Sequence, residues 1–325
     1  MSVLASLIFL FGLNLLMISS IAPNYLYRQL ATWVIGLFFF KLGQQLNLRQ
    51  LHRYRRLLVL ISCILITLPT ILNQITRGSR RWIDLGPVSF QPSEISKPLL
   101  MVNLSSLDSP FTHLLPVILI MLQPDLGSAV SVLFLLAPLV IVNKKYLIVG
   151  IISTILLLCS FPLVYRFLLH PYQQNRLTQF FNPAADPKGQ GYNVIQSKIA
   201  IGSGGIFGKG YKKGSQGQLI FLPEKHTDFI FAATAEERGL LGVVAIVCAY
   251  FFLIRSLLVK AFSSSNTANT IFTLGIALQI WFHATVNIGM NLGLLPVTGI
   301  PLPFLSVGGS SIIALLFSLG IIYSS

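Results

Sequence analysis

Apolar residues lie along this 325-residue chain in long runs, not in the alternating pattern of a half-buried sheet. Many runs approach the roughly 20 residues that an α-helix needs to cross a bilayer. A strand in lipid would leave backbone groups without partners, so these runs predict helices. They lie near residues 3–21, 29–45, 56–72, 93–107, 111–123, 126–142, 146–168, 229–257, 267–289 and 309–323. The pattern predicts an all-α polytopic membrane protein with about ten transmembrane helices, built as a single domain over residues 1–325.

Basic residues in the short loops predict how the chain lies across the membrane. Cytoplasmic loops are enriched in lysine and arginine, and this bias sets the orientation of polytopic proteins. Three predicted short loops carry Arg49, Arg53, Arg55 and Arg56, then Lys144 and Lys145, then Arg255 and Lys260. If every span crosses, these loops share one side. That side and both termini are therefore predicted to face the cytoplasm.

Composition and charge support a membrane protein and narrow its partners. Hydrophobic residues make up 54% of the chain and charged residues 10%, whereas soluble proteins carry about a quarter charged residues. Lysine and arginine outnumber the acidic residues, which gives a net charge of +14. For a chain embedded in lipid, an anionic lipid or an anionic substrate head group explains this charge better than nucleic acid does. We therefore expect no nucleic-acid partner.

Two loops on the opposite, outer side are also basic. The loop near 73–92 holds Arg77, Arg80 and Arg81 against the orientation bias, and a long, lysine-rich loop near 169–228 joins the seventh and eighth spans. Long loops are largely exempt from the bias, but the charge still needs an explanation. Either an anionic ligand binds there, which we favour, or the loops attract anionic lipid. Apolar residues among its glycines predict that the long loop is ordered and partly re-entrant.

Ionisable residues at membrane depth are costly, so each one is a candidate functional group. Glu94 and Lys97 open the fourth span after Pro92 and Ser93. Their three-residue spacing places them on one helix face, where they can pair. Ser93 is the predicted N-cap, and Pro92 suits a helix start. The pair is interpreted either as a structural ion pair or as the wall of a polar cavity at the outer end of the helices, and these interpretations are compatible.

Further acidic residues lie at the edges of spans. Asp125 follows a proline between two spans, and Asp228 ends the long loop where the eighth span begins. A carboxylate at such an edge is a candidate general base or a helix N-cap. Glu236 and Glu237 are interpreted as forming a local ion pair with the adjacent Arg238. From the residues alone, two classes stay open: an enzyme acting on a lipid pyrophosphate, and a transporter of an anionic substrate.

Five stretches of the chain resemble one family in order and spacing. They comprise residues 80–86 (RRWIDLG) continuing into 90–97 (FQPSEISK), 123–127 (QPDLG), 186–205 ending in QSKIAIGSGG, 221–231 (FLPEKHTDFIF) and 287–311. Over nearly its whole length the chain resembles the SEDS glycosyltransferases, a family of RodA (elongation), FtsW (division) and sporulation relatives. Residues 83–84, Lys198 and residues 209–210 look more like RodA. The chain departs from the family at Val307, where tyrosine is common.

The resemblance implies a function on the outer face of the bacterial cytoplasmic (inner) membrane. It implies a peptidoglycan glycosyltransferase that polymerises lipid II into glycan strands for cell elongation and shape, with inversion and undecaprenyl pyrophosphate as leaving group. A lipid II flippase and an FtsW-type division polymerase are the alternatives. The implied partners are a class B penicillin-binding protein transpeptidase and other membrane proteins of the elongation complex.

The resemblance and the charge pattern together assign the candidate site residues. The catalytic positions are Asp228, as the base, with Glu94 and Lys97. The substrate-binding positions are Arg77, Arg80, Arg81, Asp125, Lys198, Lys209, Lys225 and His226. No metal-ligand set is evident in the sequence. Assistance by a divalent cation, Mg²⁺ or Mn²⁺, in binding pyrophosphate stays open.

Overall fold

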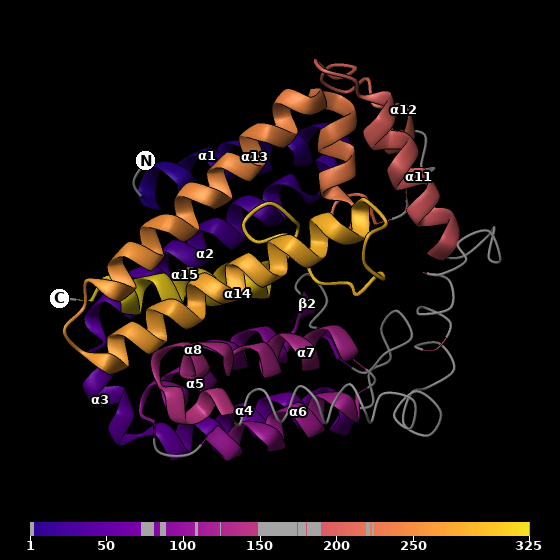
Figure 1. Ribbon diagram of the computed structural model, residues 1–325. Coiled ribbons are helices and arrows are strands. Elements are labelled where there is room, and N and C mark those ends of the chain that lie inside the picture. Colours follow the sequence, from indigo (N-terminus) through magenta and orange to yellow (C-terminus); the bar gives the residue numbers. More distant parts are fainter. Residues whose placement is uncertain are drawn as a thin grey trace. The chain divides into compact units, whose positions relative to one another are not determined.

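The computed structural model (Figure 1) describes residues 3–72, 81–84, 89–107, 110–123, 125–148, 190–218, 222 and 224–324, together with Gln174 and Phe180. The chain forms two compact units, each assembled from separate segments. The first unit comprises Met1–Trp33, Asn175–Ser256 and Ile280–Gly308, and the second comprises Val34–Gln174, Leu257–Gln279 and Gly309–Ser325. The single domain expected over residues 1–325 stays a prediction.

The predicted helical membrane fold is confirmed. Every predicted span except 146–168 falls on helical structure, and that span lies outside the described residues from position 149 onward. By length and composition, three helices in the described part of the chain can cross a membrane, namely α1 (Val3–Ile21), α13 (Ile230–Phe262) and α14 (Thr267–Asn291). Shorter apolar helices accompany them. These helices are those of a multi-pass membrane protein.

The first unit contains the described part of the predicted long loop from residue 175 onward. Its further elements are η1 (Pro23–Tyr25), the start of α2 (Leu26–Gln45), α11 (Gln190–Ser203) and α12 (Ser215–Gln218). The helices α11 and α12 confirm that this part of the loop is ordered. Whether it re-enters the membrane stays a prediction.

A glycine breaks α13 at the point where the loop backbone packs against it (Figure 1). Gly239 has φ 65° and ψ −162°, outside the helical region. A Cβ there would lie 2.5 Å from the carbonyl oxygen of Ile206, so only glycine permits this close approach. Past the break, Leu240 and Leu241 donate their N–H groups to the carbonyls of Gly205 and Ile206. The loop thus satisfies the backbone groups that the broken helix leaves unpaired.

The second unit surrounds a buried helix. Its helices are α3 (Leu48–Arg53), α4 (Arg55–Ile71), α5 (Pro92–Ser105), η2 (Pro110–His113), α6 (Leu114–Met121), α7 (Leu126–Phe134), α8 (Ala137–Val142) and α15 (Gly309–Ile322), with the ends of α2 and α13 and the start of α14. Nearly every side chain of α5 is buried, because α5 packs against both α4 and α15. Strands β1 (Ile83–Asp84) and β2 (Ser89–Phe90) pair antiparallel immediately before α5.

One local expectation, the N-cap of α5, was wrong. The helix α5 begins at Pro92, so Gln91 and not Ser93 is its N-cap residue. The Ser93 hydroxyl lies 3.4 Å from that of Ser128 instead. The span predicted over 126–142 is confirmed as an apolar helical segment over Leu126–Val142, with a turn at residues 135–136 between α7 and α8, ahead of a proline.

Candidate active site

The candidate residues fall into two groups, one in each unit. The first unit contains Asp228, Lys198, Lys209, Lys225 and His226, and the second contains Glu94, Lys97, Arg81 and Asp125. Arg77 and Arg80 lie outside the described residues. Within each unit the structure brings several of these side chains together.

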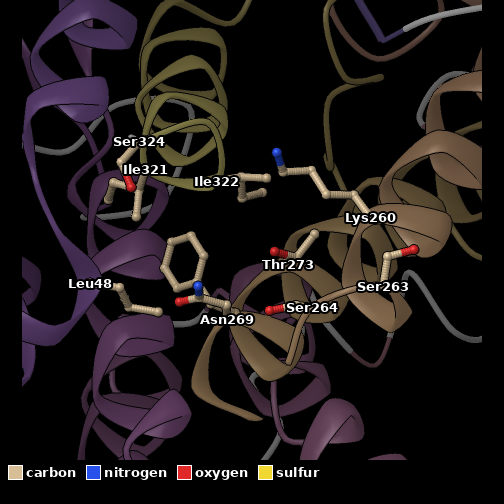
Figure 2. Close-up of a pocket in the computed structure, with 10 residues that line it drawn as sticks. Leu48, Lys260, Ser263, Ser264, Asn269, Thr273, Ile321, Ile322 and Ser324 are labelled. Carbon is tan, nitrogen blue, oxygen red and sulfur yellow. The ribbon is translucent and has the colours of Figure 1, made fainter. Parts of the chain in front are cut away.

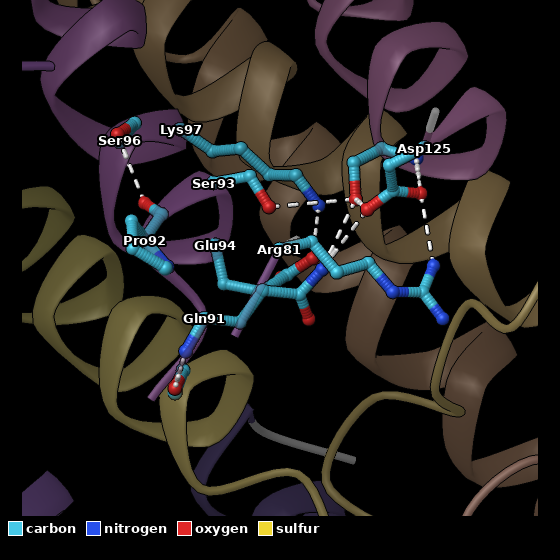
Figure 3. A network of polar contacts seen from close by, with 10 residues as sticks. Arg81, Gln91, Pro92, Ser93, Glu94, Ser96, Lys97 and Asp125 are labelled. Atoms are coloured by element: carbon cyan, nitrogen blue, oxygen red, sulfur yellow. Dashed lines mark hydrogen bonds and ion pairs between the residues drawn. The ribbon is translucent and has the colours of Figure 1, made fainter. Parts of the chain in front are cut away.

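Asp125 is the centre of a buried polar network in the second unit (Figure 3). As the N-cap of α7, its Oδ1 accepts from the Ser128 N–H at 3.2 Å, and its Oδ2 accepts from the Ser128 hydroxyl at 2.7 Å. The Arg81 guanidinium lies 3.1 Å from Oδ1, and the Gln91 amide donates to Oδ2 at 3.3 Å. Burial favours a raised pKa for Asp125, but Arg81 and the Ser128 bonds outweigh it and hold the pKa below its usual value. Asp125 is therefore an ionised carboxylate that fixes the start of a helix.

The predicted pairing of Glu94 with Lys97 is confirmed. The Lys97 ammonium donates to Glu94 Oε1 at 2.5 Å, and the two residues are only 1% and 3% exposed. Figure 3 shows the pair beside the Asp125 network, with Gln91 and Ser93 nearby. The second carboxylate oxygen, Glu94 Oε2, has no hydrogen-bond partner among the described residues although it is buried. A buried acceptor without a partner is uncommon and needs an explanation.

In the first unit, two asparagines hold the main chain of Asp228. The side-chain amides of Asn287 and Asn291 donate to the Asp228 carbonyl at 3.2 Å and 2.9 Å. Asn291 also accepts the N–H of Ala232 at 3.1 Å, so it caps the first turn of α13 from a different helix. The Asp228 residue itself is half-buried. Its backbone position is thus determined by α14.

The residues just before Asp228 are held in a similar way. The His226 carbonyl accepts from the Val307 N–H at 2.9 Å, and the Thr227 carbonyl accepts from the Ser306 hydroxyl at 2.6 Å. The His226 ring stacks on Tyr25 with a centroid distance of 4.5 Å. These contacts link the end of the long loop to the α1–α2 connection and to the segment before α15. They place His226 next to Asp228 on a fixed stretch of backbone.

Glu236 anchors the basic loop, and the sequence analysis missed this role. Its carboxylate accepts from the Lys209 ammonium at 2.7 Å, the Ser215 hydroxyl at 3.0 Å, and the N–H groups of Gln216 and Gly217 at 2.9 Å and 3.1 Å. The residue is completely buried. Four donors around one buried carboxylate make this the principal attachment of residues 209–217 to α13.

The interpretation of Glu236 and Glu237 as local partners of Arg238 was wrong. Glu236 pairs with Lys209, and both oxygens of Glu237 accept from the Ser20 hydroxyl at 2.6 Å and 2.7 Å. The reason is that α13 breaks at Gly239, so the ends of these side chains meet the loop and α1 instead of the next helical turn. A buried acid beside a lysine-rich loop is the sequence signal that points to such a contact.

Lys225 and Lys198, the other two candidate lysines, lie in different surroundings. The Lys225 ammonium donates to the carbonyl of Gly217, which ties it to the segment held by Glu236. Burial lowers the pKa of Lys225, and the nearby Glu237 charge opposes this shift. Lys198 is exposed on α11, and the end of its side chain lies over Gly293, where a Cβ would come within 2.2 Å of Lys198 Cε. Lys198 is therefore the more accessible of the two cations.

A metal site does not emerge from the described ranges. Within them, no group of three or more His, Cys, Asp or Glu side chains lies close enough together to hold a metal ion.

Together the apolar helices and the buried ion pairs define a polytopic membrane protein with hydrogen-bonded polar side chains among its helices. The family described as cell cycle proteins, which groups FtsW, RodA and SpoVE, matches residues 2–325, and the chain belongs to this family. The resemblance noted in the sequence is thus confirmed.

Individual relatives agree with this assignment. The peptidoglycan glycosyltransferase MrdB of Escherichia coli K12 is 38% identical over 312 residues, which cover 91% of this chain and 84% of that protein. A probable peptidoglycan glycosyltransferase FtsW of Trichlorobacter lovleyi is 33% identical, covering 92% and 82%.

Solved structures show the same fold. A chain from a peptidoglycan synthase complex, solved to explain how polymerisation and crosslinking are coordinated, superposes with a TM-score of 0.81 at 34% identity, covering 99% of this chain and 95% of that chain. The rod shape determining protein RodA of Thermus thermophilus gives a TM-score of 0.71 at 29% identity, covering 98% and 94%.

Proposed function

We propose that this chain polymerises lipid II into glycan strands on the outer face of the cytoplasmic membrane, as a RodA-type enzyme of cell elongation and shape. Membership of the family along residues 2–325, with peptidoglycan glycosyltransferases among its relatives, carries this proposal. The chain is a peptidoglycan glycosyltransferase. The RodA-type role is supported by 38% identity to MrdB, against 33% to an FtsW.

The proposed reaction needs a base, and we assign that role to Asp228. The 4-hydroxyl of the acceptor GlcNAc attacks the anomeric carbon of the donor MurNAc and forms the new C–O bond. The bond from that carbon to the pyrophosphate oxygen breaks, and undecaprenyl pyrophosphate leaves. The hydroxyl proton passes to the Asp228 carboxylate, and the α-linkage becomes β-1,4. The support is a half-buried carboxylate whose backbone is held by Asn287 and Asn291, because a base must be positioned within hydrogen-bond reach.

The departing pyrophosphate needs positive charge, which the basic outer segments supply. We assign direct contact to Lys198, which is exposed, and to His226, which adjoins Asp228 on the same fixed backbone. Lys209 and Lys225 are attached to the loop through Glu236 and Gly217, so we assign them to shaping the loop around the substrate. Arg77 and Arg80 keep their proposed role in binding the pyrophosphate on the strength of their charge alone.

We assign the second-unit network a positioning role. Glu94 and Lys97 neutralise one another in the buried α5, and Arg81 and Asp125 fix the start of α7 beside them. The unpartnered Glu94 Oε2 supports a role beyond stability, because a purely structural pair gains nothing from a buried acceptor left open. In this proposal Glu94 completes its hydrogen bonding only when the substrate is bound.

The proposed activity is tested with the purified chain and lipid II in detergent. Glycan strands detected by gel electrophoresis support the proposal. The flippase alternative predicts translocation of lipid II across vesicles without any polymer, and that outcome would overturn it. Expression in cells depleted of either the elongation or the division polymerase separates the subgroups. Restored rod shape identifies the RodA type, and restored septation identifies the FtsW type.

A crosslinking partner completes the proposed function. The similar solved chain belongs to a peptidoglycan synthase complex in which polymerisation and crosslinking are coordinated. We propose that this chain likewise works with a class B penicillin-binding protein transpeptidase and with other elongation-complex membrane proteins. Polymerisation is expected to be weak alone and stronger with that partner. Equal rates across a wide range of partner concentrations would contradict this pairing.

A further inference from the structure

A pocket of about 320 Å³ lies in the second unit, apart from all the residues assigned above (Figure 2). It is formed by the last turn of α13, the loop that follows, the first turns of α14, the end of α15 and the start of α3. Its lining residues are Leu48, Lys260, Ser263, Ser264, Asn269, Phe272, Thr273, Ile321, Ile322 and Ser324. By the orientation expected from the basic loops, this pocket lies on the cytoplasmic side.

The pocket has one cation and no acidic lining residue. Figure 2 shows the Lys260 side chain among the lining residues, extending toward Ile322 above Thr273 in this view. Among the residues that the structure describes, Lys260 has no carboxylate partner, and its ammonium lies 3.9 Å from the centroid of the Tyr323 ring. A cation–π contact holds an ammonium group in place without neutralising its charge. The pocket therefore keeps a net positive charge.

A buried hydroxyl also faces this space. Thr273 is 4% exposed and lines the pocket, yet its hydroxyl bonds to no residue in the described ranges. By contrast, Thr270 on the same helix donates to the carbonyl of Asn266 at 3.2 Å in the usual way. Asn269 and Thr273 are one turn apart on α14, so they share a face near the positive end of that helix. The hydroxyl of this buried threonine, open to the pocket and without a hydrogen bond to the described residues, is available to a ligand that accepts or donates there.

The remaining walls are apolar. Leu48, Phe272, Ile321 and Ile322 provide them, whereas the cation and hydroxyls gather on the α13 and α14 side. A free inorganic anion needs only the polar side of such a pocket. An amphiphile with a phosphate beside its first hydrocarbon groups uses both sides.

We propose that this pocket binds a phosphate group, and that an anionic glycerophospholipid of the cytoplasmic leaflet supplies it. Lys260, Thr273 and Asn269 contact the phosphate, and the apolar walls contact the glycerol and the first methylene groups. Basic pockets among membrane helices on the cytoplasmic side are suited to such head groups. The inference does not depend on the proposed glycosyltransferase mechanism, because none of these residues belongs to that site.

Native mass spectrometry of the full chain in detergent tests the proposal, with dioleoylphosphatidylglycerol as the probe and dioleoylphosphatidylcholine as its zwitterionic counterpart. We expect Lys260→Gln to weaken phosphatidylglycerol binding roughly five- to tenfold, and Thr273→Val to weaken it severalfold. Arg255→Gln is the matched control, because Arg255 is exposed on the same helix outside the pocket. Gel filtration establishes that each variant is folded.

Each result of these measurements either supports or overturns the proposed phospholipid site. Equal losses for Lys260→Gln and Arg255→Gln would show only general attraction to negative charge and would overturn the pocket. The same holds if phosphatidylcholine binds as tightly as phosphatidylglycerol, or if Thr273→Val binds like the wild type. Competition by millimolar inorganic phosphate separates the two sources. Displacement of the lipid by phosphate would overturn the lipid assignment in favour of a free anion, and retention of the lipid supports it.

Discussion

Asp125 in the second unit and Asp228 in the first are held in opposite ways. The Asp125 carboxylate accepts from Arg81, Gln91 and Ser128 and is 2% exposed, so its side chain is committed to the fold. Asp228 is half-buried, and its main-chain carbonyl accepts hydrogen bonds from Asn287 and Asn291. In sequence both are acids at the edge of a span. The contrast is between a half-buried acid positioned through its main chain, as expected of a base, and a buried carboxylate whose hydrogen bonds fix the start of a helix.

The largest effect is expected from Asp228→Asn. The amide keeps the shape but cannot take the proton, so polymerisation of lipid II should fall by roughly 10²- to 10⁴-fold. Thermal unfolding in detergent should change little, because the contacts to this residue's main chain persist. Asp84→Asn, which removes an exposed carboxylate elsewhere, is the control and should keep near-wild-type activity. Near-wild-type strand synthesis by purified Asp228→Asn would refute the assignment.

A second test asks whether Glu94 and Lys97 are more than a structural pair. Lys97→Met leaves the Glu94 carboxylate buried without its partner, which should cost about 3–5 kcal/mol of unfolding free energy. The double variant Glu94→Gln with Lys97→Met removes both charges and should recover most of that stability. Lys145→Met, at an exposed lysine of the same unit, should leave stability unchanged.

The activity of the stable double variant then separates the two interpretations. If the open Glu94 Oε2 serves the substrate, the double variant folds but polymerises lipid II poorly. Wild-type rates in that variant would show that the pair is structural only. Stability is measured by thermal unfolding, and activity by initial rates against lipid II concentration, on the same preparation.

Interactions within one helix could be predicted from the sequence, and those between distant segments could not. The spacing of Glu94 and Lys97 placed them on one face of α5, and their pairing followed. Lys209 and Glu236 are 27 positions apart, and Arg81 and Asp125 are 44 apart. Nothing in a local pattern encodes such pairings, because they depend on how the helices pack.

Breaks in helices also could not be predicted from the sequence pattern. The apolar runs predicted the helices, since lipid leaves the backbone little choice. The break at Gly239 was missed because a single glycine inside an apolar run fits a continuous helix equally well. Glycine is needed at position 239 because the backbones of Ile206 and Gly208 approach it so closely, and this contact is visible only in the structure. The roles of Glu236 and Glu237 were missed for this reason.

The anchor at Glu236 should show a smaller effect than the two preceding sites. Glu236→Gln weakens the attachment of residues 209–217, and bonds to a charged group contribute about 1.5–3 kcal/mol. If the loop shapes the substrate site, KM for lipid II should rise by roughly ten- to a hundredfold while kcat changes less. Lys209→Met combined with Glu236→Gln should cost little more than Glu236→Gln alone, because both disrupt the same contact. A fall in kcat with unchanged KM would argue against a role in substrate binding.

The smallest effect concerns the acid sensitivity of the Asp125 network. Its pKa is lowered in the folded chain, so its contribution to stability is full above the unfolded value near 3.9 and is lost as pH falls through the lower folded pKa. Ser128→Ala removes the hydroxyl bond at 2.7 Å and keeps the bond from the N–H, so the folded pKa should rise partway. The acid-unfolding midpoint should then move up by less than about one pH unit. Ser106→Ala, which loses a hydroxyl bond to the neutral Asn103 carbonyl, should lower stability equally at all pH values. Identical acid midpoints for Ser128→Ala and the wild type would show that the Ser128 hydroxyl does not contribute to the lowered pKa of Asp125.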